Sequence, residues 1–170
     1  MGRWTGAELS EAFERYQVAV TRSVESGDWE HFVQCFTPDA TYVEHAYGRF
    51  AGHEEIRRWV KRTMGTFPGN AMVAFPPAWS ILDEDRGWVV CEIRNLMRDP
   101  GDGSVFEASN ITILRAADDG AAEGLWAEEE DVYNPQHFLT MVTSWIRRCS
   151  ELGSLSDEAA AWAQALGIEV

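Results

Sequence analysis

Glu44 is the residue whose neighbours in the sequence best suit it to chemistry. It belongs to a predicted strand over residues 40–46, in which Ala40 and Tyr42 lie on its side. Apolar neighbours disfavour the charged form of a carboxylate, which is one way that a protein makes a general base or acid. Such a group fits proton abstraction next to a carbonyl, assistance to an aldol closure, or dehydration. The alternative is a solvated or ion-paired glutamate at the edge of a sheet.

Three further polar residues lie on predicted strands and could face the same pocket. His45 should point away from Glu44 in a regular strand, but the end of the strand would let it reach the pocket mouth. Asn95 and Asn110 interrupt apolar strand faces, where an amide needs a ligand, a water or another side chain as its partner. A surface histidine and satisfied core asparagines are the alternatives.

The acidic run from Glu128 to Asp131 also lies in a predicted strand, so alternate carboxylates must face inward in either register. An inward carboxylate opposite Glu44 would give two carboxyl groups with different proton affinities, a possible acid and base couple. We take Glu130 as the member of the run that contacts a ligand. A solvated face with a helix-capping end is the alternative.

Periodicity predicts the elements that would position these residues, because apolar spacings of three and four change to a period of two between residues 71 and 133. The predicted helices span about 6–25, 29–36, 135–151 and 157–166, with one more carrying the apolar stripe from Ile56 to Met64. The predicted strands span about 40–46, 71–82, 87–98, 105–115 and 124–133. Gly48 and Gly52 bracket a predicted loop, and Pro76-Pro77 predicts a bend or an edge position.

This order of elements predicts an α+β fold, in which a strongly curved antiparallel sheet wraps around the N-terminal helices as a cone. The apolar interior of such a cone is the default position for a small-molecule site. We expect one domain over residues 1–170, with a core of about 6–133 and two additional C-terminal helices over about 135–166.

Composition argues against several classes of function. The formal net charge is -14 and the pI is about 4.6, which argues against nucleic acid as a partner, because phosphate binding uses clustered Lys and Arg. The basic group between Arg57 and Arg62 is interpreted as a solvated helix face. Neither a signal peptide nor a run of about 18 apolar residues is found, so we expect a cytoplasmic protein without a membrane partner.

The chemistry expected of this sequence needs no metal and no cofactor. Cys35, Cys91 and Cys149 are widely spaced, which favours reduced thiols over disulfides or a zinc site. His53-Glu54 begins like the zinc motif HExxH, but Arg57 stands where the second histidine would be. The sequence has no cluster with metal-ligand spacing, no glycine-rich phosphate loop after a strand, and no nucleophile motif.

Three short segments carry a family resemblance: GDW at 27–29, FTPDA at 36–40 and GHEEIR at 52–57. Together they resemble the nuclear-transport-factor-2-like superfamily and, within it, the SnoaL-like (polyketide cyclase-like) proteins. The resemblance covers about the first 65 residues and implies the cone-shaped fold. The superfamily includes isomerases, cyclases, dehydratases, epoxide hydrolases and noncatalytic modules, so the resemblance is more specific for fold than for function.

The resemblance to steroid isomerase members of the superfamily implies roles for particular positions. It puts Glu44 at the place of their catalytic aspartate base. Their tyrosine donor matches Val20, with Tyr16 one turn earlier, and their aspartic acid donor falls near Asn110, whose amide can also donate to an oxyanion. Because position 20 lacks the tyrosine, the steroid isomerase reaction itself is not favoured.

The sequence therefore predicts a cofactor-independent isomerase, cyclase or dehydratase that binds a small hydrophobic carbonyl-type metabolite. Glu44 would accept the proton, and His45 or Asn110 would help to place the substrate. The remaining predicted substrate contacts are Tyr16, Val20, Tyr42, Trp59, Asn95 and Glu130. The alternative is a noncatalytic ligand-binding or dimerisation module with the same cone, and in either case the resemblance implies a homodimer through the outer face of the sheet.

Overall fold

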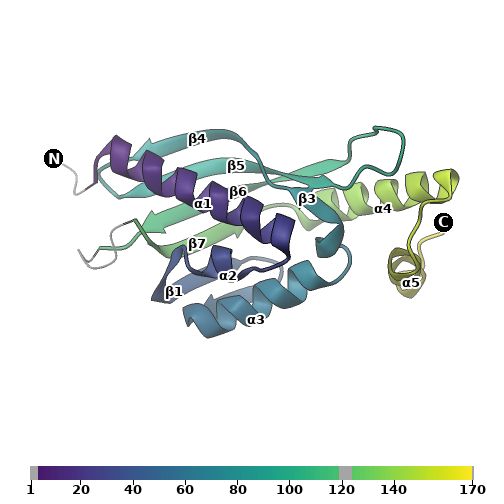
Figure 1. The fold of residues 1–170 in the computed structure, drawn as a ribbon, viewed down its shortest axis with the longest axis horizontal. Coiled ribbons are helices and arrows are strands. Elements are labelled where there is room, and N and C mark those ends of the chain that lie inside the picture. The colour runs from purple at the N-terminus through teal and green to yellow at the C-terminus, as the bar shows by residue number, and fades with distance from the viewer. Residues whose placement is uncertain (1–3, 119–123, 170) are drawn as a thin grey trace.

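The computed structural model describes residues 4–118 and 124–169 (Figure 1). The helices of this part of the chain are α1 (Gly6–Ser26), α2 (Glu30–Val33), α3 (Gly52–Gly65), the short 3₁₀ helix η1 (Gly69–Ala71), α4 (Pro135–Leu152) and α5 (Asp157–Ala165). The strands are β1 (Phe36–Glu44), β2 (Gly48–Ala51), β3 (Met72–Ala74), β4 (Pro77–Asp83), β5 (Trp88–Met97), β6 (Glu107–Ala116) and β7 (Trp126–Val132).

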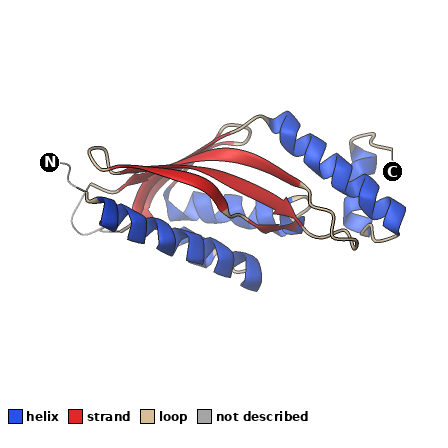
Figure 2. Ribbon diagram, turned by 90° about the horizontal axis from the view of Figure 1, so that it is seen from above, coloured by secondary structure: helices blue, strands red, loops and turns tan. Residues whose placement is uncertain are grey.

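The strands form one curved sheet (Figure 2). Their order is β2-β1-β7-β6-β5-β3, with β4 also paired to β5. Every pairing is antiparallel except that of β1 with β7, which is parallel. In Figure 1, α1 crosses in front of the sheet, α3 runs beside β1, and α4 and α5 lie at the end away from the N-terminus. The predicted α+β fold with a curved sheet is confirmed.

Two details of the sheet differ from the prediction. The sheet is mixed, because β7 returns beside β1 in the same direction. The predicted loop after Gly48 is instead strand β2, which forms a hairpin with β1 and places Phe50 opposite Tyr42. This four-residue strand is too short to show a clear period of two in the sequence. The interruption at Pro76 is present, since β3 ends at Ala74 and β4 begins at Pro77.

Local sequence signals explain where the long helices begin. Thr5 and Glu8 form a reciprocal capping box at the start of α1. Asn134 caps α4 by accepting a hydrogen bond from the N–H of Gln136, and Pro135 occupies the first helical position. None of the helices in the described ranges is long and apolar enough to cross a membrane.

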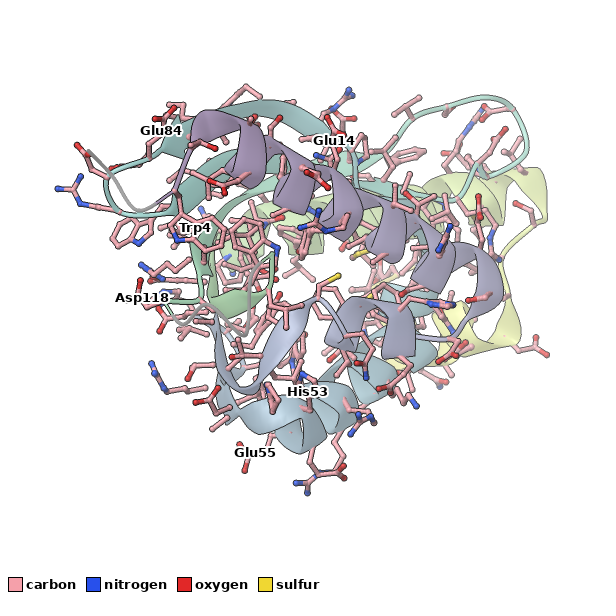
Figure 3. The ribbon with its side chains drawn as sticks, turned by 60° about the vertical axis from the view of Figure 1, so that its left-hand side comes forward. Trp4, Glu14, His53, Glu55, Glu84 and Asp118 are labelled. Carbon is pink, nitrogen blue, oxygen red and sulfur yellow. The ribbon has the colours of Figure 1, made fainter. Side chains whose placement is uncertain are left out.

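Figure 3 shows residues through which helices α1 and α3 contact the sheet. Glu84, in the turn between β4 and β5, lies beside the start of α1, and Trp4 packs against Gly87 in the same turn. His53, at the start of α3 (Figure 3), contacts the first residue of β1: its Nε2 lies 2.9 Å from the carbonyl oxygen of Phe36. These contacts fix both helices against the rim of the sheet.

Two groups of buried apolar side chains fill the fold. The first lies between α1, α2, α3 and the inner face of the sheet and includes Leu9, Phe36 and Trp126. The second lies under α4 and α5 and includes Trp145 and Ile146. The inner face between the two groups is where polar residues interrupt the apolar pattern, and it is there that a cavity opens.

Gly69 gives a test of this packing. A Cβ at this position would lie 2.1 Å from the carbonyl oxygen of Thr63, a backbone atom that cannot rotate away, whereas a Cβ on Gly65 would meet nothing within 4 Å. We predict that Gly69→Ala lowers the free energy of unfolding by about 1 to 3 kcal/mol. Gly65→Ala, in the last turn of α3, should be neutral or stabilising by up to about 1 kcal/mol. Urea-induced unfolding of both variants measures the difference, and equal stabilities would contradict the packing described here.

Candidate functional site

A cavity of about 560 Å³ lies between the inner face of the sheet and helices α1, α3, α4 and α5. Most of its wall is apolar or aromatic, with Trp59 from α3, Phe138 from α4 and Trp162 from α5 among its lining residues. Its polar wall comes from neighbouring strands: Glu44 on β1, Asn110 and Thr112 on β6, and Glu129 and Asp131 on β7. The cavity therefore combines a large apolar volume with one concentrated polar region.

The position of the carboxyl groups on β7 depends on an irregularity in its pairing. Ala116 pairs with Trp126 and Arg115 pairs with Glu128, so one extra residue of β7 is accommodated between them. Such a bulge reverses which face the following residues occupy. Trp126 and Glu129, three residues apart, are consequently both buried, at 1% and 2% exposure. Glu129 and Asp131 thus face the cavity.

Asp131 is the best-connected carboxylate of the site. It accepts hydrogen bonds from the hydroxyls of Tyr42 and Thr112 and, at 2.8 Å, from Nδ2 of Asn110. Burial raises its pKa to about 6, against the lowering effect of the Thr112 and Tyr42 hydrogen bonds, and the negative charge of Glu44 adds to the rise. Its side chain is only partly buried, unlike those of its two carboxyl neighbours.

Glu129 is almost completely enclosed and is held by the first helix. The hydroxyl of Tyr16 donates a hydrogen bond of 2.8 Å to its Oε1, while Oε2 has no partner among the described residues. Burial, and next the charge of Asp131, raise the pKa of Glu129 well above its usual value. The raised pKa favours the protonated form of this carboxyl group, which can donate a hydrogen bond.

Glu44 lies at the end of β1, where the chain turns into β2. Its Oε2 accepts hydrogen bonds from the backbone N–H groups of Ala46 at 2.8 Å and Tyr47 at 2.6 Å. Tyr133 lies against it, and burial followed by the hydrogen bond to Glu44 raises the pKa of the Tyr133 hydroxyl. Glu44 is 4% exposed. Its carboxylate is positioned by the two backbone hydrogen bonds of the turn.

Asn95 and Asn110 extend the polar region across two strands. Nδ2 of Asn95 donates to Oδ1 of Asn110 at 2.7 Å, and Nδ2 of Asn110 donates in turn to Asp131 and to the Thr112 hydroxyl. The amides are thus satisfied by one another and by the carboxylate. Asn110 is oriented by this chain, with its acceptor facing Asn95 and its donor facing β7.

Comparison with known proteins identifies the family. Residues 15–124, well over half of the chain, match the family model described as the SnoaL-like domain. The chain belongs to the SnoaL-like family. The match ends before β7, so the two inward carboxyl groups of that strand lie outside the matched residues of this SnoaL-like protein. No curated protein sequence matches the chain.

Solved structures share the fold at low sequence identity. TerC, co-crystallised with polyporic acid, is 15% identical with a TM-score of 0.57, and the alignment covers 79% of this chain and 97% of TerC. A protein with a ketosteroid isomerase-like fold from Catenulispora acidiphila, in complex with trimethylamine, is 20% identical with a TM-score of 0.57, covering 74% and 90%. An NTF2-like protein from Anabaena variabilis is 13% identical with a TM-score of 0.56, covering 78% and 96%.

The structure gathers most of the predicted site residues of the SnoaL-like chain in one place. The residues that line the cavity as expected are Tyr16, Val20, Tyr42, Glu44, Trp59, Asn95 and Asn110. Their roles stay predictions. Within the described ranges, no group of three or more His, Cys, Asp or Glu is arranged to hold a metal ion.

Two predicted residues lie elsewhere, and their placement in the pocket is corrected. His45 and Glu130 are on the outer face of the sheet, where His45 Nε2 lies 3.0 Å from Oε1 of Glu130. Arg115 binds the other oxygen of Glu130 at 2.8 Å. His45 follows the regular alternation of β1, and Glu130 faces outward because of the bulge in β7. Neither residue lines the cavity.

Sequence reasoning missed Glu129, Asp131 and Thr112 as cavity residues. The acidic run shows that some carboxylates must face inward, but counting by twos from the apolar Trp126 selects Glu128 and Glu130. The bulge reverses this choice, and the run itself has no apolar residue that would reveal the change. Thr112 was hidden because threonine is an ordinary strand residue.

The opposite environments of Asp131 and Glu130 give a prediction about stability and pH. A carboxyl group whose pKa is higher in the folded protein than in the unfolded chain stabilises the fold fully at pH values below its unfolded pKa. For Asp131 this stabilisation is lost as the pH rises through about 6. We therefore predict that the free energy of unfolding of Asp131→Asn rises relative to that of wild type between pH 4 and pH 7, by on the order of 2 kcal/mol.

Glu130→Gln is the matched control, with the opposite sign. Hydrogen bonds from His45 and Arg115 lower the pKa of Glu130 in the folded protein. Glu130 therefore stabilises the fold at pH values above its unfolded pKa, and this stabilisation is lost as the pH falls through its folded pKa. Denaturant titrations of wild type and both variants at several pH values test the pair. Parallel pH profiles for the two variants would show that the environments do not differ as described.

Proposed function

We propose that this SnoaL-like protein is a cofactor-independent enzyme that moves a proton on a small, largely apolar, carbonyl-containing metabolite. Isomerisation, cyclisation and dehydration all belong to this chemistry. One observation carries the proposal: three carboxyl groups, Glu44, Glu129 and Asp131, converge on a cavity of about 560 Å³ whose other walls are mainly apolar. A cavity of this size with a few converging polar groups of perturbed pKa suits a small substrate.

Asp131 is our candidate for the proton acceptor. A pKa near 6 leaves it mostly ionised at neutral pH and still close to the operating pH, which is the best compromise for a general base. Its side chain is also more open than those of Glu44 and Glu129, which are 4% and 2% exposed. Glu44, the residue favoured by the sequence, is then a second carboxylate whose charge helps to set the pKa of Asp131.

Glu129 is our candidate for stabilising developing negative charge on the substrate oxygen, and the Tyr16 hydroxyl positions it through the hydrogen bond to Oε1. Burial favours the protonated form of Glu129, and its unpartnered Oε2 is the atom available to carry the proton. A tyrosine beside a protonated carboxylic acid is the donor arrangement that steroid isomerases use. Here the tyrosine comes from position 16 of α1 instead of position 20, and the acid comes from β7.

The similar structures support a small organic ligand in this position. TerC was crystallised with polyporic acid and the Catenulispora acidiphila protein with trimethylamine. Because both are less than 25% identical to this chain, they support the use of the fold for small molecules and leave the ligand to be found by experiment.

The alternative is a noncatalytic module that binds ligands or a second copy of the chain. Trp79 and Ile81, two residues apart on β4, are 43% and 62% exposed, and neighbouring exposed apolar side chains favour an interaction surface. Light scattering tests the expected homodimer, and a species of 19.1 kDa would count against it.

Proton exchange separates the enzyme from the binding module. In deuterium oxide, the wild-type protein should exchange the α-protons of a bound apolar ketone, with NMR as the measurement. We predict that Asp131→Asn lowers the exchange rate by a factor of about 10² to 10⁴. Glu130→Gln removes a carboxylate from the same strand on the opposite face and should keep the rate within about twofold of wild type.

The same assay identifies the base. Loss of exchange in Glu44→Gln together with retention in Asp131→Asn would transfer the role to Glu44. Ketones that bind to wild type without any exchange would remove the enzymatic proposal and leave the binding module.

A further inference from the structure

The charges around the cavity do not balance. Three acidic residues line it, whereas Arg62 is the only basic residue among the described lining residues, and its side chain is exposed. The hydrogen bonds that the three carboxyl groups accept come from tyrosine, threonine and asparagine side chains and from backbone N–H groups, all of them uncharged. Buried ionised carboxylates are normally paired with a cation, and within residues 4–118 and 124–169 no cationic side chain forms a hydrogen bond with these three groups.

A second observation, independent of the acidic cluster, points to a ligand donor. Oε2 of Glu129 is buried in the cavity wall and has no hydrogen-bond partner among the described residues. An unsatisfied oxygen of this kind costs on the order of 1 to 3 kcal/mol, and more if it is charged. A ligand that brings a hydrogen-bond donor to this oxygen would remove the cost.

The aromatic wall beside these groups suits a cation as well. Tyr42 and Trp59 line the cavity with their ring centroids 4.4 Å apart, and Tyr133 and Phe138 line it with centroids 4.7 Å apart. The faces of such rings attract ammonium groups by about 1 to 2 kcal/mol when the site excludes water. The cavity thus offers negative charge, an unpartnered acceptor and aromatic rings together.

We propose that the cavity binds an apolar organic cation: a protonated amine on an aromatic or aliphatic skeleton, with its ammonium group between Glu129, Asp131 and Glu44. An ammonium group has up to three donors and no acceptor, which matches three carboxyl groups and the free Oε2. The inference goes beyond the proposed function, because the ammonium group would occupy the carboxyl groups that act on a carbonyl substrate. An amine and a ketone would therefore compete for the cavity.

The raised pKa values of Asp131 and Glu129 favour their protonated forms, which reduces the negative charge of the cavity wall. The titratable groups facing Asp131 are Tyr16 from α1, Tyr42 and Glu44 from β1, Cys91 from β5, Glu129 from β7, and Tyr133 after it. None of these is basic, so an ammonium ion must displace protons from the carboxyl groups. Amine binding should therefore release protons and strengthen as the pH rises.

Three probes of one skeleton test the ligand class by isothermal titration calorimetry: tryptamine, which is a cation, tryptophol, which is neutral, and indole-3-acetate, which is an anion. We expect affinity to fall in that order, with tryptamine at least about tenfold tighter than tryptophol, the effect of one charge-assisted hydrogen bond. The tryptamine affinity should rise about tenfold between pH 5 and pH 7 as a group of pKa about 6 ionises, and tryptophol should show no such rise.

Variants place the binding in the cavity. Asp131→Asn should weaken tryptamine about tenfold or more and remove the pH dependence, while Glu130→Gln, which loses the same charge on the outer face, should stay within about twofold. Glu44→Gln serves as a second test if circular dichroism shows that Asp131→Asn is not folded. Equal affinity for tryptamine and tryptophol, tightest binding of indole-3-acetate, or no binding of tryptamine at millimolar concentration would each overturn the proposal.

The two proposals fail in different ways. Selective tryptamine binding in a protein that exchanges no α-proton would keep the ligand class and remove the enzyme. Proton exchange on neutral ketones, without any preference for amines, would keep the enzyme and remove the ligand class.

Discussion

Burying three carboxyl groups in one aromatic cavity is the constraint on which the rest of this structure depends. Each oxygen taken out of water needs a donor or a proton, because an isolated buried carboxylate is too costly for a protein of ordinary stability. The donors come from separate parts of the chain: Tyr16 from α1, Tyr42 from β1, and Asn110 with Thr112 from β6. Helix and strands must therefore assemble together for Glu129 and Asp131 to be accommodated, whereas Glu44 receives its hydrogen bonds from its own turn.

The sequence predicted the helices and the general fold well, since these depend on local signals. The apolar stripes placed α1 and α4 within a residue or two of their observed bounds. Alternation in β1 correctly put Ala40, Tyr42 and Glu44 on one buried face. Patterns of this kind need no knowledge of the distant chain.

The polar half of the cavity was harder to predict, because it depends on pairing between distant strands. The four consecutive acidic residues of β7 have no apolar marker, and only the bulge opposite Ala116 determines that Glu129 and Asp131 face inward. The parallel pairing of β1 with β7 likewise left no local trace in either strand. A sequence can reveal that carboxylates must be buried, but the register decides which ones.

The parallel pairing of β1 and β7 also determines when the site can exist during synthesis. Tyr42 and Asp131, which are hydrogen-bonded in the cavity, are 89 residues apart, and Tyr16 and Glu129 are 113 apart. At about 5 to 20 residues per second, a ribosome adds the stretch between them in several seconds to about twenty seconds. Until β7 has been made, Tyr16 and Tyr42 lack the carboxyl groups to which they donate, so the polar part of the cavity cannot form earlier.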